Sequence, residues 1–369
     1  MDISIDIIEY NDSKTKPRVY DYNYYDKVDT MPQWYPFCSI PFLKVYSSRY
    51  VKDWLRGKQL KKMLKGRHYD IIQCHYILGL YAGADYLKSH CDKLYFTFWG
   101  GELKYCRYLG SNNTFKNGIK QILYKDVDAI INGGVGAAVS CEKEGRIPKV
   151  YYGVFGSVPL EEIYKCIQEK NRNQCKSYWK MPQEKLSVQL GYSGKTIHQY
   201  LEIIDELKTH EELKAKLHLV APMTRGASHD YIQKVDLALN ESGYSYTVID
   251  RHLTDKEMAI YRCSIDVVLQ LAINDGYSRS IVEAISAGSV LIYGDWLKYD
   301  KSFKRDGFKG FAVDSIKTGV EKINFIIQNR EECMDVCKEN IKNGKNKNMW
   351  SECIKDWVNV YEGWASPIN

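Results

Sequence analysis

The sequence has few of the features that are typical of disordered chains or of chains stabilised by disulfide bonds or metal ions. Only 9 of its 369 residues are proline. Hydrophobic residues make up 44% of the chain and charged residues 27%, and these globular proportions exclude a disordered or collagen-like chain. Its 11 cysteines are scattered, odd in number and without a C-x-x-C pair, which indicates free thiols in a reducing compartment. Cys333 and Cys337 share a helical face but are too few for a zinc site.

Targeting and membrane-spanning segments are also missing. Residues 1–6 include no basic region followed by an apolar core. No run approaches the ~20 apolar residues that a spanning helix requires. We therefore expect a cytoplasmic protein.

Glycine is absent from residues 11–50, and no helical pattern is clear there. A doubly wound nucleotide or sugar domain normally opens with a strand, a glycine-rich turn and a helix. Residues 3–8 are strand-like, but the turn and helix do not follow. We expect the first βα unit to be missing or atypical.

The charge is modest and the tyrosine content is high. A net charge of +6 favours anionic ligands or a membrane surface over a dedicated duplex-DNA binder, and we expect no nucleic-acid partner. The 30 tyrosines suit stacking on sugars or bases, but compositional bias is the simpler explanation and the one we favour.

Strands and helices alternate along the chain in two sets. In the first set, residues 69–75 and 93–98 are expected strands that flank a helix at 77–89, and such a βαβ unit implies a parallel sheet. Short strands at 129–131 and 150–152 continue this set. The second set comprises strands at 186–190, 216–220, 245–249, 265–271 and 289–293, with helices at 197–208, 228–240, 255–263 and 279–287.

This alternation predicts an α/β chain with two doubly wound, Rossmann-like domains. We place the first domain at 1–155, a polar helical connector at 156–185 and the second domain at 186–348. The last segment, 349–369, has one apolar helical stripe, and we expect it to pack back on the first domain.

The segment after strand 265–271 is the most informative one. Gly276, Ser278 and Ser280 open a helix whose first amides are free to meet an anion. Asp275 and Glu283 are eight positions apart and can face one cleft, which suits a ligand with both hydroxyls and phosphates, such as a nucleotide sugar. The alternative is that Ser280 and Glu283 form a capping box.

A second candidate site is the turn Gly191-Tyr192-Ser193-Gly194-Lys195-Thr196 after strand 186–190. Its glycines allow close backbone approach, and Lys195 supplies positive charge. The alternative is a plain glycine turn in which Thr196 and Gln199 cap the next helix. Thr254 and Glu257 form a further expected capping box.

These segments resemble the GT-B glycosyltransferases of family 4 type. Asp275 and Glu283 match the family's acidic pair, with Asp in place of the usual first Glu, and residues 283–288 match its E-A-x-x-x-G continuation. The resemblance covers residues from about 65 onward. It implies that Asp275 contacts donor-sugar hydroxyls, that Glu283 holds the ribose, and that Lys195 and Arg225 lie near the donor diphosphate.

By the same resemblance, Lys195 and Asp275 take the catalytic roles. The remaining donor-binding residues are then Gly191, Ser193, Gly194, Arg225, Gly276, Tyr277, Ser278 and Glu283. In the first domain, Trp99, Gly100, Gly101 and Glu102 stand where the family often has His-Gly-x-Asp. Trp99 could stack on an acceptor or simply pack over a tight turn. His75 is an acceptor-side candidate, with a structural role as its alternative.

The resemblance implies a retaining, metal-independent glycosyltransferase of the hexosyltransferase type that needs no cofactor. It would move a sugar from a nucleotide-sugar donor to a glycan or polyprenyl-linked acceptor in bacterial surface polysaccharide biosynthesis. The basic segment 52–67 would then dock on an anionic membrane surface, or else form a solvated helical face. The main rival is a non-catalytic GT-B-like partner subunit. A Rossmann oxidoreductase is disfavoured because no G-x-G-x-x-G follows the first strand.

Overall fold

The computed structural model describes residues 4–11, 27–32, 49–75, 84–97, 127–131, 149–151, 153 and 155–367. The chain divides into two compact units. Unit 1 comprises Met1–Gly153 with Val358–Asn369, and unit 2 comprises Val154–Trp357. Both are α/β, as the alternation of elements predicts, and each is described by itself.

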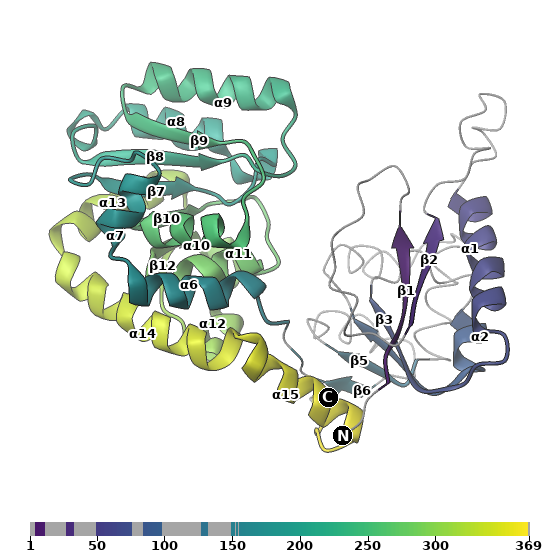
Figure 1. Ribbon diagram of the computed structural model, residues 1–369. Helices are drawn as coiled ribbons and strands as arrows, with labels where there is room; N and C mark the ends of the chain where they lie inside the picture. The colour runs from purple at the N-terminus through teal and green to yellow at the C-terminus, as the bar shows by residue number, and fades with distance from the viewer. Residues whose placement is uncertain are drawn as a thin grey trace, which may run out of the picture. The chain divides into compact units, whose positions relative to one another are not determined.

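Unit 1 contains a parallel sheet of the order β3-β4-β5-β6 (Figure 1). Its strands are β3 (Tyr69–His75), β4 (Cys91–Thr97), β5 (Ala129–Ile131) and β6 (Lys149–Tyr151). Leu94, Phe96 and Ile130 are fully buried in it. The parallel arrangement is confirmed, and of the helix expected at 77–89 the structure describes α2 (Ala84–Lys88).

The opening of unit 1 contains a strand pair that the sequence did not predict in full. β1 (Asp6–Asn11) runs parallel to β2 (Lys27–Pro32), which lies inside the glycine-free segment. The helix α1 (Arg49–Leu64) follows. The Tyr69 hydroxyl donates to Asp6 Oδ2 at 2.8 Å and so joins the starts of β1 and β3. Among the described residues, the opening of unit 1 therefore contains two parallel strands followed by a helix.

Unit 2 is built on one six-stranded parallel sheet of the order β12-β11-β10-β7-β8-β9 (Figure 1). Its strands are β7 (Leu186–Leu190), β8 (Leu217–Pro222), β9 (Ser245–Ile249), β10 (Val267–Gln270), β11 (Val290–Gly294) and β12 (Phe311–Val313). The chain proceeds outward from β7 in one direction and then from β10 in the other. The carboxyl ends of β7 and β10 thus form the switch point at which open α/β sheets bind ligands.

Helices cover both faces of this sheet because its strands are apolar on both sides. Val188 and Leu269 pack into one core with α8 (Tyr200–Lys208), α9 (His229–Ser242) and α13 (Ile316–Gln328). Val268 and Leu291 point the other way, into a core with α10 (Asp255–Ser264), α11 (Arg279–Ser286) and α12 (Asp300–Asp306).

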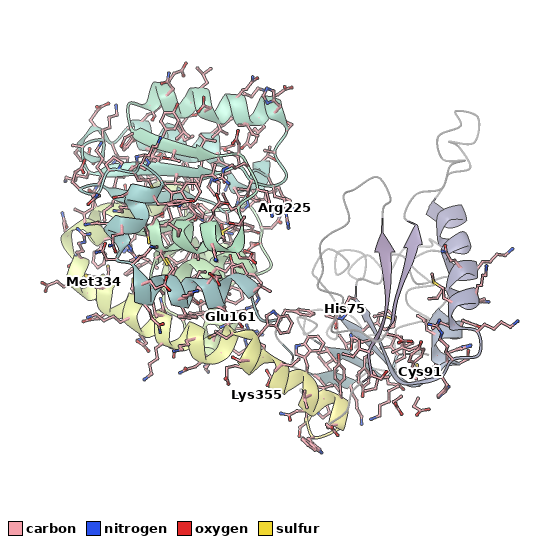
Figure 2. All side chains as sticks on the ribbon, viewed as in Figure 1. His75, Cys91, Glu161, Arg225, Met334 and Lys355 are labelled. Atoms are coloured by element: carbon pink, nitrogen blue, oxygen red, sulfur yellow. The ribbon has the colours of Figure 1, made fainter. Side chains whose placement is uncertain are left out.

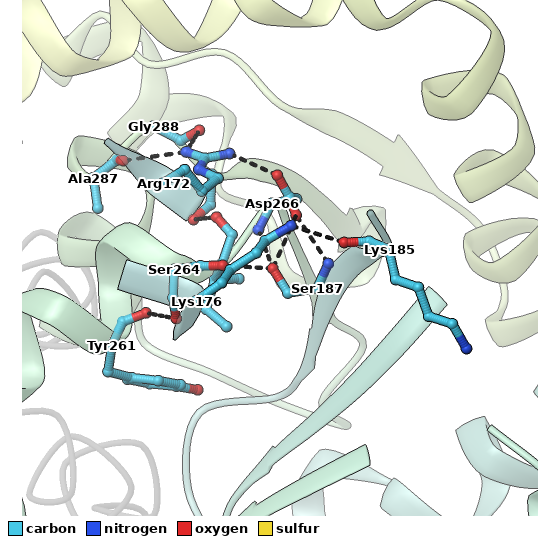
Figure 3. Close-up of polar contacts among 11 residues, drawn as sticks. Arg172, Lys176, Lys185, Ser187, Tyr261, Ser264, Asp266, Ala287 and Gly288 are labelled. Atoms are coloured by element: carbon cyan, nitrogen blue, oxygen red, sulfur yellow. Dashed lines mark hydrogen bonds and ion pairs between the residues drawn. The ribbon is translucent and has the colours of Figure 1, made fainter. Parts of the chain in front are cut away.

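The expected connector is helical and belongs to unit 2. It forms α6 (Val158–Glu169) and α7 (Arg172–Tyr178), both in contact with α10. From α7, Arg172 and Lys176 form ion pairs of 3.1 and 2.6 Å with Asp266, which also accepts from Ser187 at the start of β7 (Figure 3). Burial by itself raises the pKa of Asp266, but the two cations hold that pKa below its usual value.

The last two helices are α14 (Arg330–Asn348) and α15 (Trp350–Glu362). α14 includes the polar stretch 342–348. The side-chain amides of Asn340 and Asn343 donate to the backbone carbonyls of Lys309 and Gly307, so these polar residues hold the helix against the segment after α12. Near the end of α15, Tyr361 stacks on Tyr95 of unit 1 with ring centroids 6.2 Å apart. Among the described residues, we find no helix with the length and apolarity to cross a membrane.

Candidate functional site

The turn after β7 leaves the sheet at the switch point. Gly191 has a φ of 62°, which glycine adopts at little cost, and its N–H donates to Leu269 of β10 at 2.9 Å. Gly194 donates to the carbonyl of Arg225 at 2.9 Å, and a Cβ there would lie 2.4 Å from Cβ of Ala227. The turn is therefore held by β10 and by the loop that follows β8, and its second glycine is required by close packing.

The loop after β10 meets this turn through Asp275. Asp275 Oδ1 accepts from the hydroxyl of Tyr192 at 2.6 Å, and Oδ2 accepts from the backbone N–H of Ser278 at 3.2 Å. The Tyr299 hydroxyl also donates to Oδ2. The structure thus brings the two predicted segments together, and it assigns Asp275 three donors that fix its orientation.

Tyr277 is held in a left-handed conformation beside Asp275. Its φ is 62°, which a bulky residue adopts only where its surroundings enforce it. Its hydroxyl donates to Asp306 Oδ2 at 3.0 Å, and Arg305 forms an ion pair of 2.6 Å with the other oxygen of Asp306. Burial first, and then the Asp306 charge, raise the pKa of Tyr277, so it remains a neutral donor.

Two cations of the predicted site lie at the surface. Lys195 is exposed, and its stem runs against Gly226, where an added Cβ would come within 2.8 Å of Lys195 Cγ. Arg225 is also exposed (Figure 2). Beneath them, His198 is buried and shares a 3.0 Å hydrogen bond with Ser193 Oγ. Burial lowers the pKa of His198 to about 4, Asp275 opposes that shift and Lys195 adds to it.

Glu283 is buried rather than open at the surface. Its Oε2 forms an ion pair of 3.2 Å with Arg262 of α10, and its Oε1 accepts from Ser157 Oγ at 2.6 Å. Arg262 in turn donates to Gln189 Oε1 at 3.1 Å, and the amide of Gln189 donates to the Gly191 carbonyl. Glu283 therefore supports the β7 turn from below through a chain of charged and polar groups.

The predicted capping boxes have different outcomes. Thr254 and Glu257 form one at the start of α10, as predicted. The box proposed for Ser280 and Glu283 is wrong, because α11 begins after Ser278 and Glu283 is paired with Arg262. The pairing of Thr196 with Gln199 is also wrong: these residues bound a single 3₁₀ turn, and Gln199 instead donates to the Leu271 carbonyl.

The acceptor-side candidates belong to unit 1. His75 ends β3, opposite Thr97 of β4 (Figure 2). The segment with Trp99, Gly100, Gly101 and Glu102 lies outside the described residues. Within the described part of the chain, no group of three His, Cys, Asp or Glu side chains is placed to hold a metal ion.

Several site residues were missed by sequence reasoning. Tyr299 and Asp306 hold the β10 loop, whereas Arg262 and Ser157 hold Glu283. Tyr299 lies 24 positions from Asp275 and Ser157 lies 126 from Glu283, so no local spacing joins them. The one available signal is Tyr192, which lies inside the candidate turn after β7.

No family model matches the chain, and no curated protein matches its sequence. Solved structures match its fold. Sucrose-phosphate synthase from Thermosynechococcus elongatus matches with a TM-score of 0.72 at 12% identity, over 97% of this chain and 88% of that chain. HepE from Anabaena, in complex with UDP and glucose, matches with 0.62 at 13% identity, over 91% of this chain and 86% of that one.

A third match is α,α-trehalose 6-phosphate synthase from Burkholderia multivorans, with a TM-score of 0.63 at 12% identity, over 87% of this chain and 75% of that chain. These solved structures are GT-B proteins, and likeness at such identities shows the fold alone. The chain therefore has the two-domain GT-B fold that the sequence predicted.

Proposed function

We propose that the chain is a glycosyltransferase of the hexosyltransferase type that takes its sugar from a nucleotide-sugar donor. The observation that carries the proposal is the 2.6 Å hydrogen bond from Tyr192 to Asp275, which joins the β7 turn to the β10 loop at the switch point. A carboxylate, glycine backbone and the exposed Lys195 lie within this one region. Sugar hydroxyls and a diphosphate are the groups that such a combination binds.

The proposed chemistry is transfer with retention of configuration and without a metal. An acceptor hydroxyl attacks the anomeric carbon, the bond from that carbon to the diphosphate breaks, and a phosphate oxygen takes the hydroxyl proton. Lys195 and the first amides of α11 stabilise the charge that develops on the departing diphosphate. Asp275 orients the sugar, because its own orientation is fixed by Tyr192 and Tyr299.

The proposed acceptor is a glycan or a polyprenyl-linked saccharide of bacterial surface polysaccharide, used at the inner face of the cell membrane. Support for a membrane surface comes from the end of α1, where an open surface depression of about 360 Å³ is lined by Gln59, Lys62, Met63, Lys65 and Arg67. Lys62 and Lys65 are exposed and can meet anionic headgroups, whereas Arg67 is half-buried and forms an ion pair with Asp6. Retention of the full chain on phosphatidylglycerol vesicles but not phosphatidylcholine vesicles tests this part separately.

The donor is tested by calorimetry with UDP-, GDP- and dTDP-sugars. UDP-glucose is the first choice because HepE is in complex with UDP and glucose. We expect binding of one nucleotide class, and Lys195→Ala should weaken it at least tenfold, whereas Lys61→Ala on α1 should not. Equal effects of the two substitutions would remove Lys195 from the site, and silence across the panel would count against the transferase.

A second candidate is a non-catalytic GT-B-like partner subunit. The observation in its favour is that both oxygens of Glu283 are occupied, by Arg262 and Ser157, so that a ribose must displace Ser157 to reach the carboxylate. This candidate predicts no nucleotide binding by the purified chain. Co-purification with an active glycosyltransferase whose turnover falls when this chain is removed would support it.

A further inference from the structure

Three cysteine thiols meet in the small core between the connector and α10. They are Cys166 near the end of α6, Cys175 of α7 and Cys263 of α10. The sulfur atoms of Cys166 and Cys175 are 3.7 Å apart, and Cys263 donates to the Ile163 carbonyl beside them. The surrounding side chains are apolar, with Leu160, Ile163 and Ala259 in the same core.

The fold keeps Cys166 and Cys175 together. Only Lys170 and Asn171 separate α6 from α7, and Asn171 caps α7 in a capping box with Gln174. The tight corner therefore turns the chain back so that the last turn of α6 faces the first turns of α7. Lys170 and Asn171 are exposed, so the pair lies just beneath the surface.

The three thiols differ in chemical character. The polar contact with Cys263 lowers the pKa of Cys166 most strongly, burial opposes that shift, and Cys175 and the nearby charge of Lys170 lower the pKa further. The same contacts and burial raise the pKa of Cys263. A thiolate is the nucleophilic form of cysteine, and Cys166 also keeps the largest exposed fraction of the three, 6% against 5% for Cys263 and 0% for Cys175. We therefore take Cys166 as the thiol that meets the oxidant.

We propose that Cys166 and Cys175 form a peroxide-sensitive thiol site that closes to a disulfide. The Cys166 thiolate attacks one oxygen of a hydroperoxide, the O–O bond breaks, and Cys166 becomes a sulfenic acid while hydroxide leaves. The Cys175 sulfur then attacks the sulfenic sulfur. The sulfenic hydroxyl leaves as water with the Cys175 proton, and two thiols are thereby oxidised by one peroxide.

Geometry favours this pairing. The sulfur atoms must approach by about 1.7 Å to reach the ~2.05 Å of a disulfide bond, a movement within reach of side-chain rotation at a helix corner. A small thiol such as glutathione restores the pair by thiol–disulfide exchange. Cys263 lies in the same core as the pair and follows Arg262 in the sequence, so Cys263 connects the oxidised pair to the ion pair that holds Glu283.

Cys333 and Cys337 of α14 provide an internal control. They are also free, buried and close in sequence, but burial raises the pKa of both, in the case of Cys337 to about 11. They should therefore remain thiols under conditions that oxidise Cys166. A general sensitivity of buried cysteines would affect both pairs equally.

Tryptic cleavage separates the candidate cysteines. Cys166 falls in the peptide 166–170, Cys175 in 173–176 and Cys263 in 263–279, while both α14 cysteines share 331–338. The reduced full-length chain is treated with one to ten equivalents of hydrogen peroxide, blocked with N-ethylmaleimide in denaturant and digested without reductant. We expect a linked 166–170/173–176 product and full maleimide labelling of 331–338.

The variant Cys175→Ser removes the resolving thiol. It should abolish the linked product and leave a Cys166 sulfenic acid that dimedone traps, whereas Cys166→Ser should abolish both. If either variant fails to fold, the wild-type peptide map decides. A linked 166–170/263–279 product, or equal oxidation of the α14 cysteines, would overturn the assignment.

Discussion

Arg262 and Glu283 form an ion pair of 3.2 Å in which both side chains are almost completely buried. The pair joins α10 to α11, and Arg262 continues the contact to Gln189 of β7. Desolvation of the two charges offsets much of their attraction, so the pair adds little net stability. Through Gln189, which donates to the Gly191 carbonyl, the pair connects both helices to the β7 turn. Removal of one charge would leave the other buried and unpaired.

We therefore expect Glu283→Ala to lower the free energy of unfolding by about 3–5 kcal/mol, since it leaves Arg262 charged and buried without its carboxylate. The double change Arg262→Met with Glu283→Leu should recover most of this loss. Urea titration followed by tryptophan fluorescence measures both. Glu321→Ala, at an exposed position of α13, is the control and should change the value by less than about 0.5 kcal/mol.

A further substitution, Glu283→Gln, asks whether Glu283 contacts the donor in addition to its contact with Arg262. Glu283→Gln keeps the size of the side chain and an oxygen acceptor for Ser157. If Glu283 holds the donor ribose, Glu283→Gln weakens nucleotide binding at temperatures where the variant is fully folded. A Glu283→Ala variant that loses less than about 1 kcal/mol would contradict the buried-pair argument.

A second prediction concerns the tyrosine that joins the two loops. Tyr192→Phe removes the hydroxyl that donates to Asp275 and nothing else. We expect the free energy of unfolding to fall by about 1.5 kcal/mol, because a hydrogen bond to a charged group is lost. Donor affinity should fall about tenfold, measured by calorimetry, since Asp275 keeps only Tyr299 as a side-chain donor.

The matched control is Tyr178→Phe, because Tyr178 is 53% exposed and packs edge-on against Trp179 through its ring. It should leave donor affinity unchanged. Indistinguishable affinities for the two variants would show that the Tyr192 hydroxyl does not position the site.

Local features of the fold could be predicted from the sequence. Strands β7 and β9 begin and end where the apolar runs do, and the capping box of Thr254 and Glu257 marks the start of α10. These signals succeed because period-2 strands and caps depend on residues within a few positions of one another. The same locality explains the failure at Ser280, where a suitable spacing to Glu283 was present but a distant arginine competed for the carboxylate.

The candidate site was only partly predictable because its contacts are long-range. The sequence predicts that Asp275 lies in a loop after a strand, and it lies in the loop after β10. Its hydroxyl donors, however, come from Tyr192 and Tyr299, in two other loops. From the sequence alone, compositional bias is the favoured explanation of the tyrosine excess. In this unit, however, Tyr192, Tyr277 and Tyr299 donate to carboxylates of the site framework, so part of the excess has a structural use.

A third prediction uses two glycines of the site that differ in their surroundings. Gly194→Ala places a Cβ against Ala227, so we expect a loss of about 1–3 kcal/mol in the free energy of unfolding and weaker donor binding, because the turn must shift. Gly276→Ala meets no atom within 4 Å and should leave the melting temperature unchanged. Thermal unfolding and calorimetry are measured on both variants.

The comparison isolates close approach by a ligand. If Gly276→Ala folds normally but binds the donor less well, the added methyl group occupies space that the ligand needs. If Gly194→Ala melts at the wild-type temperature, the close packing of the turn on Ala227 is wrong.

The last prediction is a pH dependence of stability set by His198 and His218. Burial lowers the pKa of each from 6.5 to about 4 in the folded chain. In the unfolded chain each takes up a proton near pH 6.5, so the unfolded state binds more protons between pH 6.5 and 4, and falling pH favours unfolding over that window. Each histidine then lowers the free energy of unfolding by up to about 1.4 kcal/mol per pH unit and by about 3 kcal/mol over the whole window. Above pH 7 neither histidine changes the free energy of unfolding.

The double variant His198→Gln with His218→Gln should therefore lose stability less steeply than the wild type as the pH falls through this window. Urea titrations at pH 7, 6, 5 and 4.5 measure the slopes, and the difference between the two proteins removes the contribution of carboxylates that titrate in both. His252→Gln, at an exposed position, is the control and should keep the wild-type slope. Equal slopes for the double variant and the wild type would contradict the prediction that burial lowers the pKa of the two imidazoles.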